Sequence, residues 1–371
     1  MRLKEKDAGI ELARIICCLF VIFMHTDGMI PRMVEGKAMA LPVFLECISR
    51  PAVGVFFLIT GFLFYGEKPV MDYFKRFLVG ILVPTVGYVL VSNLLLPFLL
   101  NRFLGMQLPA IEAGVVVKAL VSGHSSDLLY GIHLWYIYEL GKLYLCIPLL
   151  SLICRETKEA DKARIYLLVL GFLAMVLAES LEILFGKQSV LDIADYFPFS
   201  IYILYFLVGY TLKRYINQNR AKSASGQKRF VRPMWLLIGY LFFACLLFDC
   251  EMYFDYAAEG GPDYRFYSYR SVIIFFMAIC LLLGCHNIKF RSAAAKRLVL
   301  FLGKYSFYIY LLHVFMLPVV DKLLKGVRNM IPVFIYPFVL LAAIFVTTLL
   351  PAVAVGWSYE KICLRTQNMV K

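Results

Sequence analysis

The chain has 371 residues, of which 61% are hydrophobic and 17% charged, and its mean hydropathy is +0.77. These values exclude a soluble globular domain and are typical of a polytopic membrane protein. The formal net charge is +13. Basic residues beside membrane helices ordinarily set orientation and contact anionic lipid, so membrane lipids are expected partners and nucleic acid is not.

The apolar segments predict an all-α fold with about ten transmembrane helices, because each span needs about 20 apolar residues. We expect these spans at residues 10–30, 43–65, 77–100, 132–153, 164–185, 197–212, 233–254, 268–285, 298–318 and 333–357. The connections are short, so residues 1–371 are expected to form a single integral-membrane domain. With the N-terminus inside, 24 of the 38 lysines and arginines fall in inner connections, which places both termini in the cytoplasm.

The N-terminal segment also has features of a secretory signal, with Ala38-Met39-Ala40 as a nominal cleavage site. The stretch between Met24 and Ala40 is long and polar for a cleavage region, and Arg14 interrupts the apolar run. We therefore expect the segment to be retained as the first span.

This first span carries two ionisable residues, Arg14 and His25, on one helical face. They are eleven residues apart, which an α-helix converts to about 20° in azimuth and roughly 16 Å along its axis. Ionisable groups are costly in hydrocarbon, so the pair indicates a functional site. His25 is a candidate general base, and Arg14 a cation for a carboxylate, phosphate or oxyanion. The alternatives are that Arg14 reaches inner headgroups and that His25 bonds a neighbouring helix.

The second span contains GVFFLITGFLF, in which Gly54 and Gly61 allow close helix approach and Thr60 offers a hydroxyl. It is followed by Lys75 and Arg76 at the inner interface. These two side chains either contact the phosphates of a cytoplasmic nucleotide cofactor or follow the positive-inside rule.

The fourth span opens with HLWYIYELGKLY from His133. Trp135 is expected at the outer interface, where aromatic residues anchor helices. Glu139 and Lys142 are i, i+3 neighbours and predict a buried ion pair, with substrate binding by Glu139 as the alternative. His133 would line an outer mouth or be in contact with water.

The ninth span, LGKYSFYIYLLHVFML, places His313 deep in an apolar helix, at the predicted depth of His25. Lys304 is nine residues earlier, half a turn out of phase, so the two side chains cannot face one cavity. The ten cysteines show neither a Cys-x-x-Cys motif nor Cys/His ligand spacing. No disulfide framework and no metal site are therefore expected.

Four of these blocks together resemble acyltransferase family 3, the integral membrane acyltransferases that modify cell-surface polysaccharides. Arg14 and His25 are similar to the family's Arg-x10-His, and GVFFLITGFL resembles its Gly-x-x-Phe-Phe-x-x-Ser-Gly block, with Thr60 at the serine position. HLWY and LGKYSFYIYLLH are similar to two later blocks. The chain departs from the pattern after the second span, where Lys75-Arg76 replaces Arg-x-x-Arg, and at Glu139, where some members carry a Glu-Glu pair.

The resemblance implies an O-acyltransferase of the plasma membrane that uses acetyl-CoA or another short acyl-CoA. Its acceptor would be a hydroxyl of an envelope glycan or of the lipid-linked sugar precursor. His25 would be the general base and Arg14 would order the donor or the oxyanion, with His313 and Glu139 shaping the site. The alternative classes are a secondary transporter or flippase, which would contain paired broken helices, and a membrane scaffold or sensor.

Overall fold

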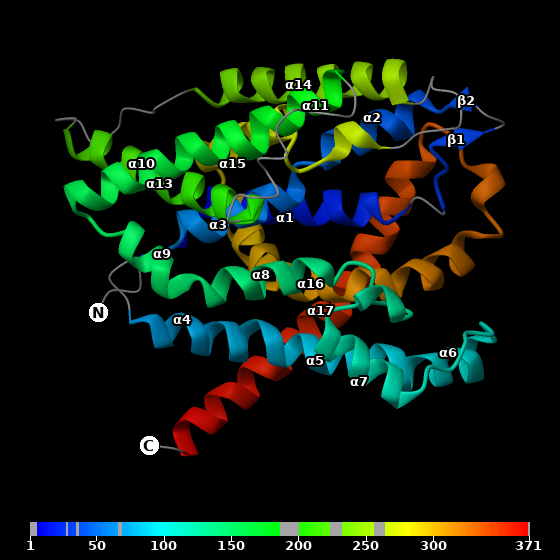
Figure 1. Cartoon of the computed structure of the whole chain (residues 1–371). Helices are drawn as coiled ribbons and strands as arrows, with labels where there is room; N and C mark the ends of the chain where they lie inside the picture. Colours follow the sequence, from blue (N-terminus) through cyan, green and yellow to red (C-terminus); the bar gives the residue numbers. More distant parts are fainter. Residues whose placement is uncertain are drawn as a thin grey trace. The chain divides into compact units, whose positions relative to one another are not determined.

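The computed structural model describes residues 6–26, 29–34, 37–65, 69–185, 200–222, 232–255 and 264–369. In these ranges the regular structure is helical apart from one short antiparallel pair, β1 (Met33–Val34) and β2 (Lys37–Ala38), as Figure 1 shows. The predicted all-α class is therefore confirmed.

The helices vary widely in length, and some are joined by π-helical turns. They are α1 (Ala8–Met24), α2 (Ala40–Ser49), α3 (Ala52–Phe62), α4 (Val70–Phe77), α5 (Val83–Leu90), α6 (Leu96–Leu104), α7 (Ala113–Ser122), α8 (Trp135–Leu145), α9 (Ile147–Ile153), α10 (Lys158–Gly171), α11 (Ala178–Phe185), α13 (Ile201–Lys222), α14 (Pro233–Cys250), α15 (Val272–His286), α16 (Ala293–Leu324) and α17 (Tyr336–Met369). The π-helical turns are Leu78–Leu82, Val91–Leu95, Phe172–Leu177 and Glu251–Asp255. Three 3-10 turns are Ser125–Asp127, Arg265–Tyr267 and Arg328–Met330.

Six helical stretches of the described residues are long and apolar enough to cross a membrane. They are Ala40–Phe62, Val70–Phe103, Lys158–Leu184, Pro233–Phe254, Ala293–Leu324 and Tyr336–Cys363. The chain is thus a multi-pass membrane protein. The other predicted spans also coincide with helices, namely α1, α13, α15 and the pair α8 and α9, and the count of ten spans stays a prediction.

The pair α8 and α9 departs from the single span expected at residues 132–153, because its axis bends by 59° between Leu145 and Ile147. Pro148 lies at the start of α9. A proline lacks the N–H for the helical hydrogen bond, and its ring clashes with the carbonyl four residues earlier, that of Tyr144. A proline at this place therefore accounts for the break.

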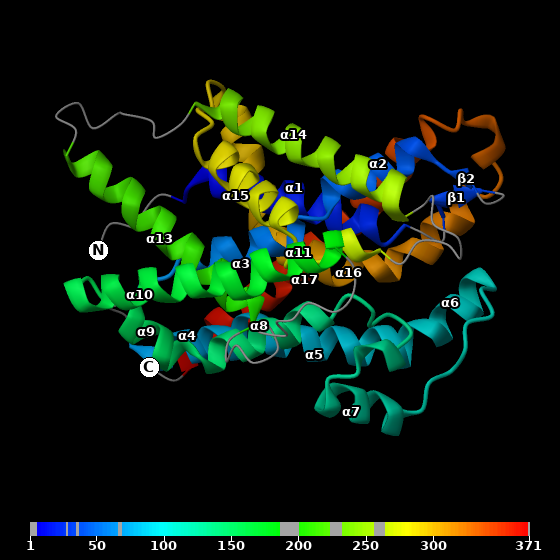
Figure 2. The same ribbon diagram turned by 45° about the horizontal axis from the view of Figure 1, so that its top comes forward.

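The chain divides into two compact units. The first comprises Met1–Gly66 and Ile153–Ser306. In it α1 packs against α2, α3 and α15, and α3 packs against α13, while Figure 2 shows α14 beside α15. A Cβ atom on Gly61 would lie 1.8 Å from the carbonyl oxygen of Phe206, and one on Gly209 would lie 2.0 Å from that of Leu58. The close helix approach predicted for the second span is confirmed.

The second unit comprises Glu67–Leu152 and Phe307–Lys371. Here α4 contacts α8 through the stacked rings of Phe77 and Tyr144, whose centroids are 4.9 Å apart. The hydroxyl of Tyr359 on α17 donates a hydrogen bond to the carbonyl of Val79 at 2.6 Å. The bond between Tyr359 and Val79 joins the two sequence segments that form the unit.

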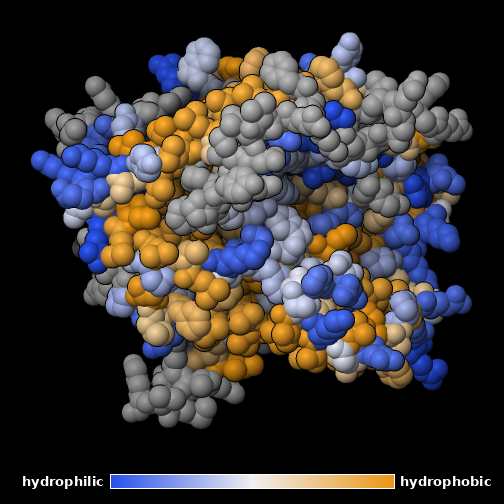
Figure 3. All heavy atoms as spheres, viewed as in Figure 1, coloured by the Kyte–Doolittle hydropathy of each residue, from blue (hydrophilic) through white to orange (hydrophobic). Residues whose placement is uncertain are grey.

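Many large hydrophobic side chains are exposed, and hydrophobic residues, in orange, cover a wide area of the face in Figure 3. On α14 alone, Met234, Trp235, Ile238 and Phe242 are each about half exposed or more. In water such a stripe would cost free energy, whereas lipid chains cover it at no such cost. The surface therefore fits a bilayer.

Candidate active site

The N-terminal end of α1 is anchored through Asp7. Its side chain accepts hydrogen bonds from the backbone N–H groups of Gly9 and Ile10, at 2.9 and 3.3 Å, and its Oδ2 lies 2.8 Å from Nδ1 of His286 on α15. Burial opposes ionisation, but the hydrogen bond and charge of His286 and the two backbone amides together lower the pKa of the Asp7 carboxyl below its ordinary value. The start of α1 is therefore both capped and tied to α15.

Arg14 lies two turns further along α1 and pairs with a carboxylate that sequence reasoning missed. Its Nη1 is 3.2 Å from Oε1 and 3.3 Å from Oε2 of Glu11. Glu11 is buried and Arg14 is 30% exposed. Gly303 on α16 makes room for Glu11, because a Cβ there would lie 2.4 Å from Glu11 Oε2. The i, i+3 spacing was the available signal.

His25 is the residue at which α1 ends. Its backbone N–H bonds the carbonyls of Val21 and Ile22 at 3.3 and 3.2 Å, and its side chain is half-buried. The next residue, Thr26, is buried and donates its hydroxyl to Phe23 O at 2.6 Å. The imidazole is thus presented at a helix end whose backbone is held by several hydrogen bonds.

A buried charge network lies beside this helix end. Arg32 donates to Phe23 O at 3.3 Å and to Ile30 O at 2.5 Å. Its Nη2 also lies 2.6 Å from Oε2 of Glu46 on α2, and the side chains of both residues are about 5% exposed or less. The other carboxylate oxygen of Glu46, Oε1, lies 2.8 Å from Nη2 of Arg50.

Arg50 ends this network on the side of α2. Its guanidinium carbon lies 4.0 Å from the ring centroid of Tyr267. None of Arg32, Glu46 and Arg50 was predicted as a site residue. The available signal was the ionisable pair Glu46 and Arg50 within one apolar helix.

The second unit contains the two predicted histidines His133 and His313, which the structure brings together. Their rings meet edge to face with centroids 5.0 Å apart, and both side chains are buried. Nε2 of His133 lies 3.2 Å from Leu311 O, and Nδ1 of His313 lies 2.6 Å from Tyr310 O. Because a carbonyl oxygen only accepts, these two nitrogens carry hydrogens.

The burial of His133 corrects one expectation. We expected it at an outer mouth or in water, but it is 1% exposed, so contact with water is wrong. Tyr310 donates its hydroxyl to the backbone carbonyl of His133 at 2.5 Å. His313 is buried and Lys304 on the same helix is exposed, so the two side chains lie on different faces, as predicted.

Glu139 and Lys142 form the predicted ion pair, with Nζ and Oε1 2.5 Å apart. The lysine is 67% exposed, so the expected burial is wrong for this side chain. Trp135, the first residue of α8, is half-buried. The pair therefore lies at the protein surface.

The remaining candidates differ in what they offer a ligand. Thr60 donates its hydroxyl to Phe56 O on its own helix at 2.9 Å, which leaves only its acceptor capacity. Lys75 and Arg76 are exposed in the last turn of α4. Their two cations are accessible to an anionic ligand such as a phosphate.

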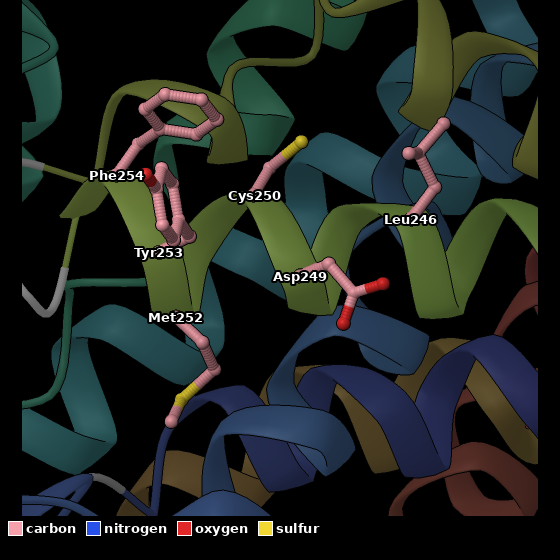
Figure 4. A pocket seen from close by; sticks show the side chains of 6 residues that line it. All are labelled: Leu246, Asp249, Cys250, Met252, Tyr253 and Phe254. Carbon is pink, nitrogen blue, oxygen red and sulfur yellow. The ribbon is translucent and has the colours of Figure 1, made fainter.

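An open hollow at the end of α14 contains none of the predicted residues. Figure 4 shows its lining, which is Leu246, Asp249, Cys250, Met252, Tyr253 and Phe254. All six come from one helix and the π-helical turn that follows it. With a single carboxylate and a mostly apolar lining, the hollow lacks the paired acid and base groups that transfer chemistry uses.

Comparison with known proteins identifies the family. The family model described as an acyltransferase domain, that of acyltransferase family 3, matches residues 7–356. No curated protein and no solved structure matches the chain. The match covers nearly the whole chain and includes Arg14, His25, His133 and His313. The chain therefore belongs to acyltransferase family 3 and is a membrane acyltransferase.

Proposed function

We propose that this chain is an O-acyltransferase of the plasma membrane. It moves a short acyl group, most simply acetyl from acetyl-CoA, to a hydroxyl of an envelope polysaccharide or of its lipid-linked precursor. The observation that carries the proposal is the half-buried imidazole of His25 at the end of α1, within the region matched by the acyltransferase model. Family membership also favours this function over the transporter and scaffold alternatives.

His25 acts as the general base. A neutral ring nitrogen takes the proton of the acceptor hydroxyl as its oxygen attacks the thioester carbonyl carbon, and the carbonyl electron pair moves to the oxygen. When this tetrahedral oxyanion collapses, the C=O bond forms again and the C–S bond breaks. The thiolate leaves with the proton from the imidazolium. The products are an O-acyl ester and free CoA thiol, and His25 returns to its neutral form.

Arg14 orders the donor. With ten spans and both termini in the cytoplasm, Arg14 lies near the inner end of α1 and His25 about 16 Å further out. CoA is cytoplasmic, so its pantetheine arm passes Arg14 to bring the thioester to His25. The exposed pair Lys75 and Arg76 offers two cations that suit the phosphates of a nucleotide.

The remaining candidates shape the substrate sites. His313, His133 and Glu139 bring buried or half-buried polar groups, and Trp135 offers a ring for a sugar to stack on. Thr60 contributes a hydroxyl oxygen as an acceptor. The acceptor glycan or lipid-linked sugar would be recognised by such a mixture of aromatic and hydrogen-bonding groups.

A transfer assay tests the function. Purified wild type and His25→Gln would be incubated with radiolabelled acetyl-CoA and an envelope extract, and label in the glycan would be counted. His124→Gln, which changes an exposed histidine, is the matched control. Wild type and the control should transfer label, and His25→Gln should not. Equal transfer by His25→Gln would overturn the assignment of the base, and no transfer by wild type would overturn the function.

A further inference from the structure

Arg50 is a cation within a candidate membrane span. The predicted second span was 43–65, and the helical stretch begins at Ala40 and ends at Phe62. Arg50 is therefore the eleventh of 23 residues, near the midpoint, between α2 and Pro51. A cation at this depth is costly and is ordinarily retained for function.

The charge is held in a fixed direction. Glu46 binds Arg50 Nη2 through one oxygen at 2.8 Å and Arg32 through the other at 2.6 Å. The ring of Tyr267 lies 4.0 Å from the guanidinium carbon. These groups stabilise the cation within the bilayer and leave the side chain 24% exposed.

The same network reaches the backbone that carries His25. Arg32 bonds the carbonyls of Phe23 and Ile30, which flank the helix end on both sides. Arg50 is at the other end of the network, on the opposite carboxylate oxygen of Glu46 from Arg32. The base and the cation are therefore placed by one continuous set of hydrogen bonds that runs through Glu46.

Arg14 cannot supply a cation at the same place. Eleven residues of helix put it about 16 Å from His25, and its Nη1 faces the carboxylate of Glu11. An oxyanion forms within a few ångströms of the base, because the attacked carbonyl carbon bonds the oxygen that the base deprotonates. Of these two arginines, Arg50 is the one that the ion pairs through Glu46 and Arg32 join to the end of α1 that carries His25.

We propose that Arg50 is a catalytic residue that stabilises the oxyanion formed beside His25, and that Glu46 and Arg32 are its positioning residues. This inference rests on the proposed function and divides between two arginines the roles first given to Arg14. In the step concerned, the thioester carbonyl electron pair moves to oxygen as the acceptor oxygen bonds the carbon. The guanidinium N–H groups donate to that oxygen until the C–S bond breaks.

Kinetics with acetyl-CoA and envelope extract would test the role of Arg50. Arg50→Gln should lower kcat about 100-fold or more, as loss of an oxyanion donor does elsewhere, with little change in the KM for acetyl-CoA. Arg50→Lys, which keeps the charge, should retain more activity than Arg50→Gln. The matched control is Arg164→Gln, because Arg164 is also buried and pairs with Asp161 at 2.5 Å; it should transfer as wild type does.

Rescue and a double-mutant cycle separate this role from a structural one. Added guanidinium should restore part of the activity of Arg50→Ala and none to His25→Gln. Glu46→Gln should lower kcat in wild type and have no further effect in Arg50→Gln, since Glu46 acts through Arg50. Each variant would first be checked for a single symmetric peak in size-exclusion chromatography in detergent. If a variant fails this check, the activities of Arg50→Lys and wild type would be compared instead.

The outcomes distinguish the two proposals. If wild type transfers no label, the proposed function fails. If wild type transfers label and His25→Gln does not, but Arg50→Gln matches Arg164→Gln, the proposed function stands and the role of Arg50 is refuted. An Arg50→Lys variant no more active than Arg50→Gln, together with no guanidinium rescue, would also refute it.

Discussion

Replacing Gly61 by alanine should separate α3 from α13 and lower stability. The added Cβ would lie 1.8 Å from Phe206 O, whereas Cβ contacts below 3.0 Å are essentially never found. The two backbones must therefore part by more than 1 Å, and no flexible side chain can absorb the change. Overpacking commonly lowers the free energy of unfolding by about 1 to 3 kcal/mol. Because the clash is with backbone atoms, we expect Gly61→Ala to cost about 3 kcal/mol.

The assay is thermal unfolding in detergent, with Gly284→Ala as the control. Gly284 also lies within a helix, but its added Cβ would meet only Leu236 Cβ at 3.7 Å, an ordinary contact. Alanine there should stabilise by up to about 1 kcal/mol, since it is the better helix former. The two substitutions should shift the unfolding temperature in opposite directions. Equal shifts would refute the close packing of α3 on α13.

Three further changes test the start of α1 and the histidine pair. Asp7→Asn keeps the cap but loses the charge. Because the folded pKa of Asp7 lies below its ordinary 3.8, wild type should be more stable than the variant at neutral pH and should lose that advantage as the pH falls below about 3.8. A stability difference that does not change with pH would contradict this. Glu11→Gln should raise the KM for acetyl-CoA more than it lowers kcat, because Arg14 loses the carboxylate that orients it. A change in kcat alone would contradict the role of Arg14 in ordering the donor. His133→Phe keeps a ring but loses the hydrogen bond to Leu311 O, which should cost about 1 kcal/mol in thermal unfolding, and an unchanged unfolding temperature would contradict the bond.

Hydropathy located the helices because a helix that spans a membrane appears in the sequence as a long run of apolar residues. Each of the ten predicted spans coincides with helix in the described residues. Helix ends were less accurate, and the error at one end mattered most. Starting the second span at residue 43 instead of Ala40 put Arg50 three residues nearer the end of the span than the helical stretch does.

Partners across space were harder to predict than residues on one helix. The pairs Glu11 with Arg14 and Glu139 with Lys142 are three residues apart, so spacing alone is sufficient to find them. Arg32 and Glu46 are 14 residues apart and come from a loop and a helix. Their pairing depends on how the turn after α1 folds, which single-sequence periodicity does not record.

The charge network around Glu46 has a consequence for membrane insertion. The bonds from Arg32 to Phe23 O and to Glu46, and the pairing of Glu46 with Arg50, join residues between Phe23 and Arg50, so these contacts need only the first helical hairpin of the chain. An isolated arginine or acidic residue at the centre of an inserting helix costs about 3 kcal/mol. If α1 and α2 enter the bilayer as a pair, the hydrogen bonds that orient Arg50 form during biosynthesis and lower the cost of placing these charges in lipid.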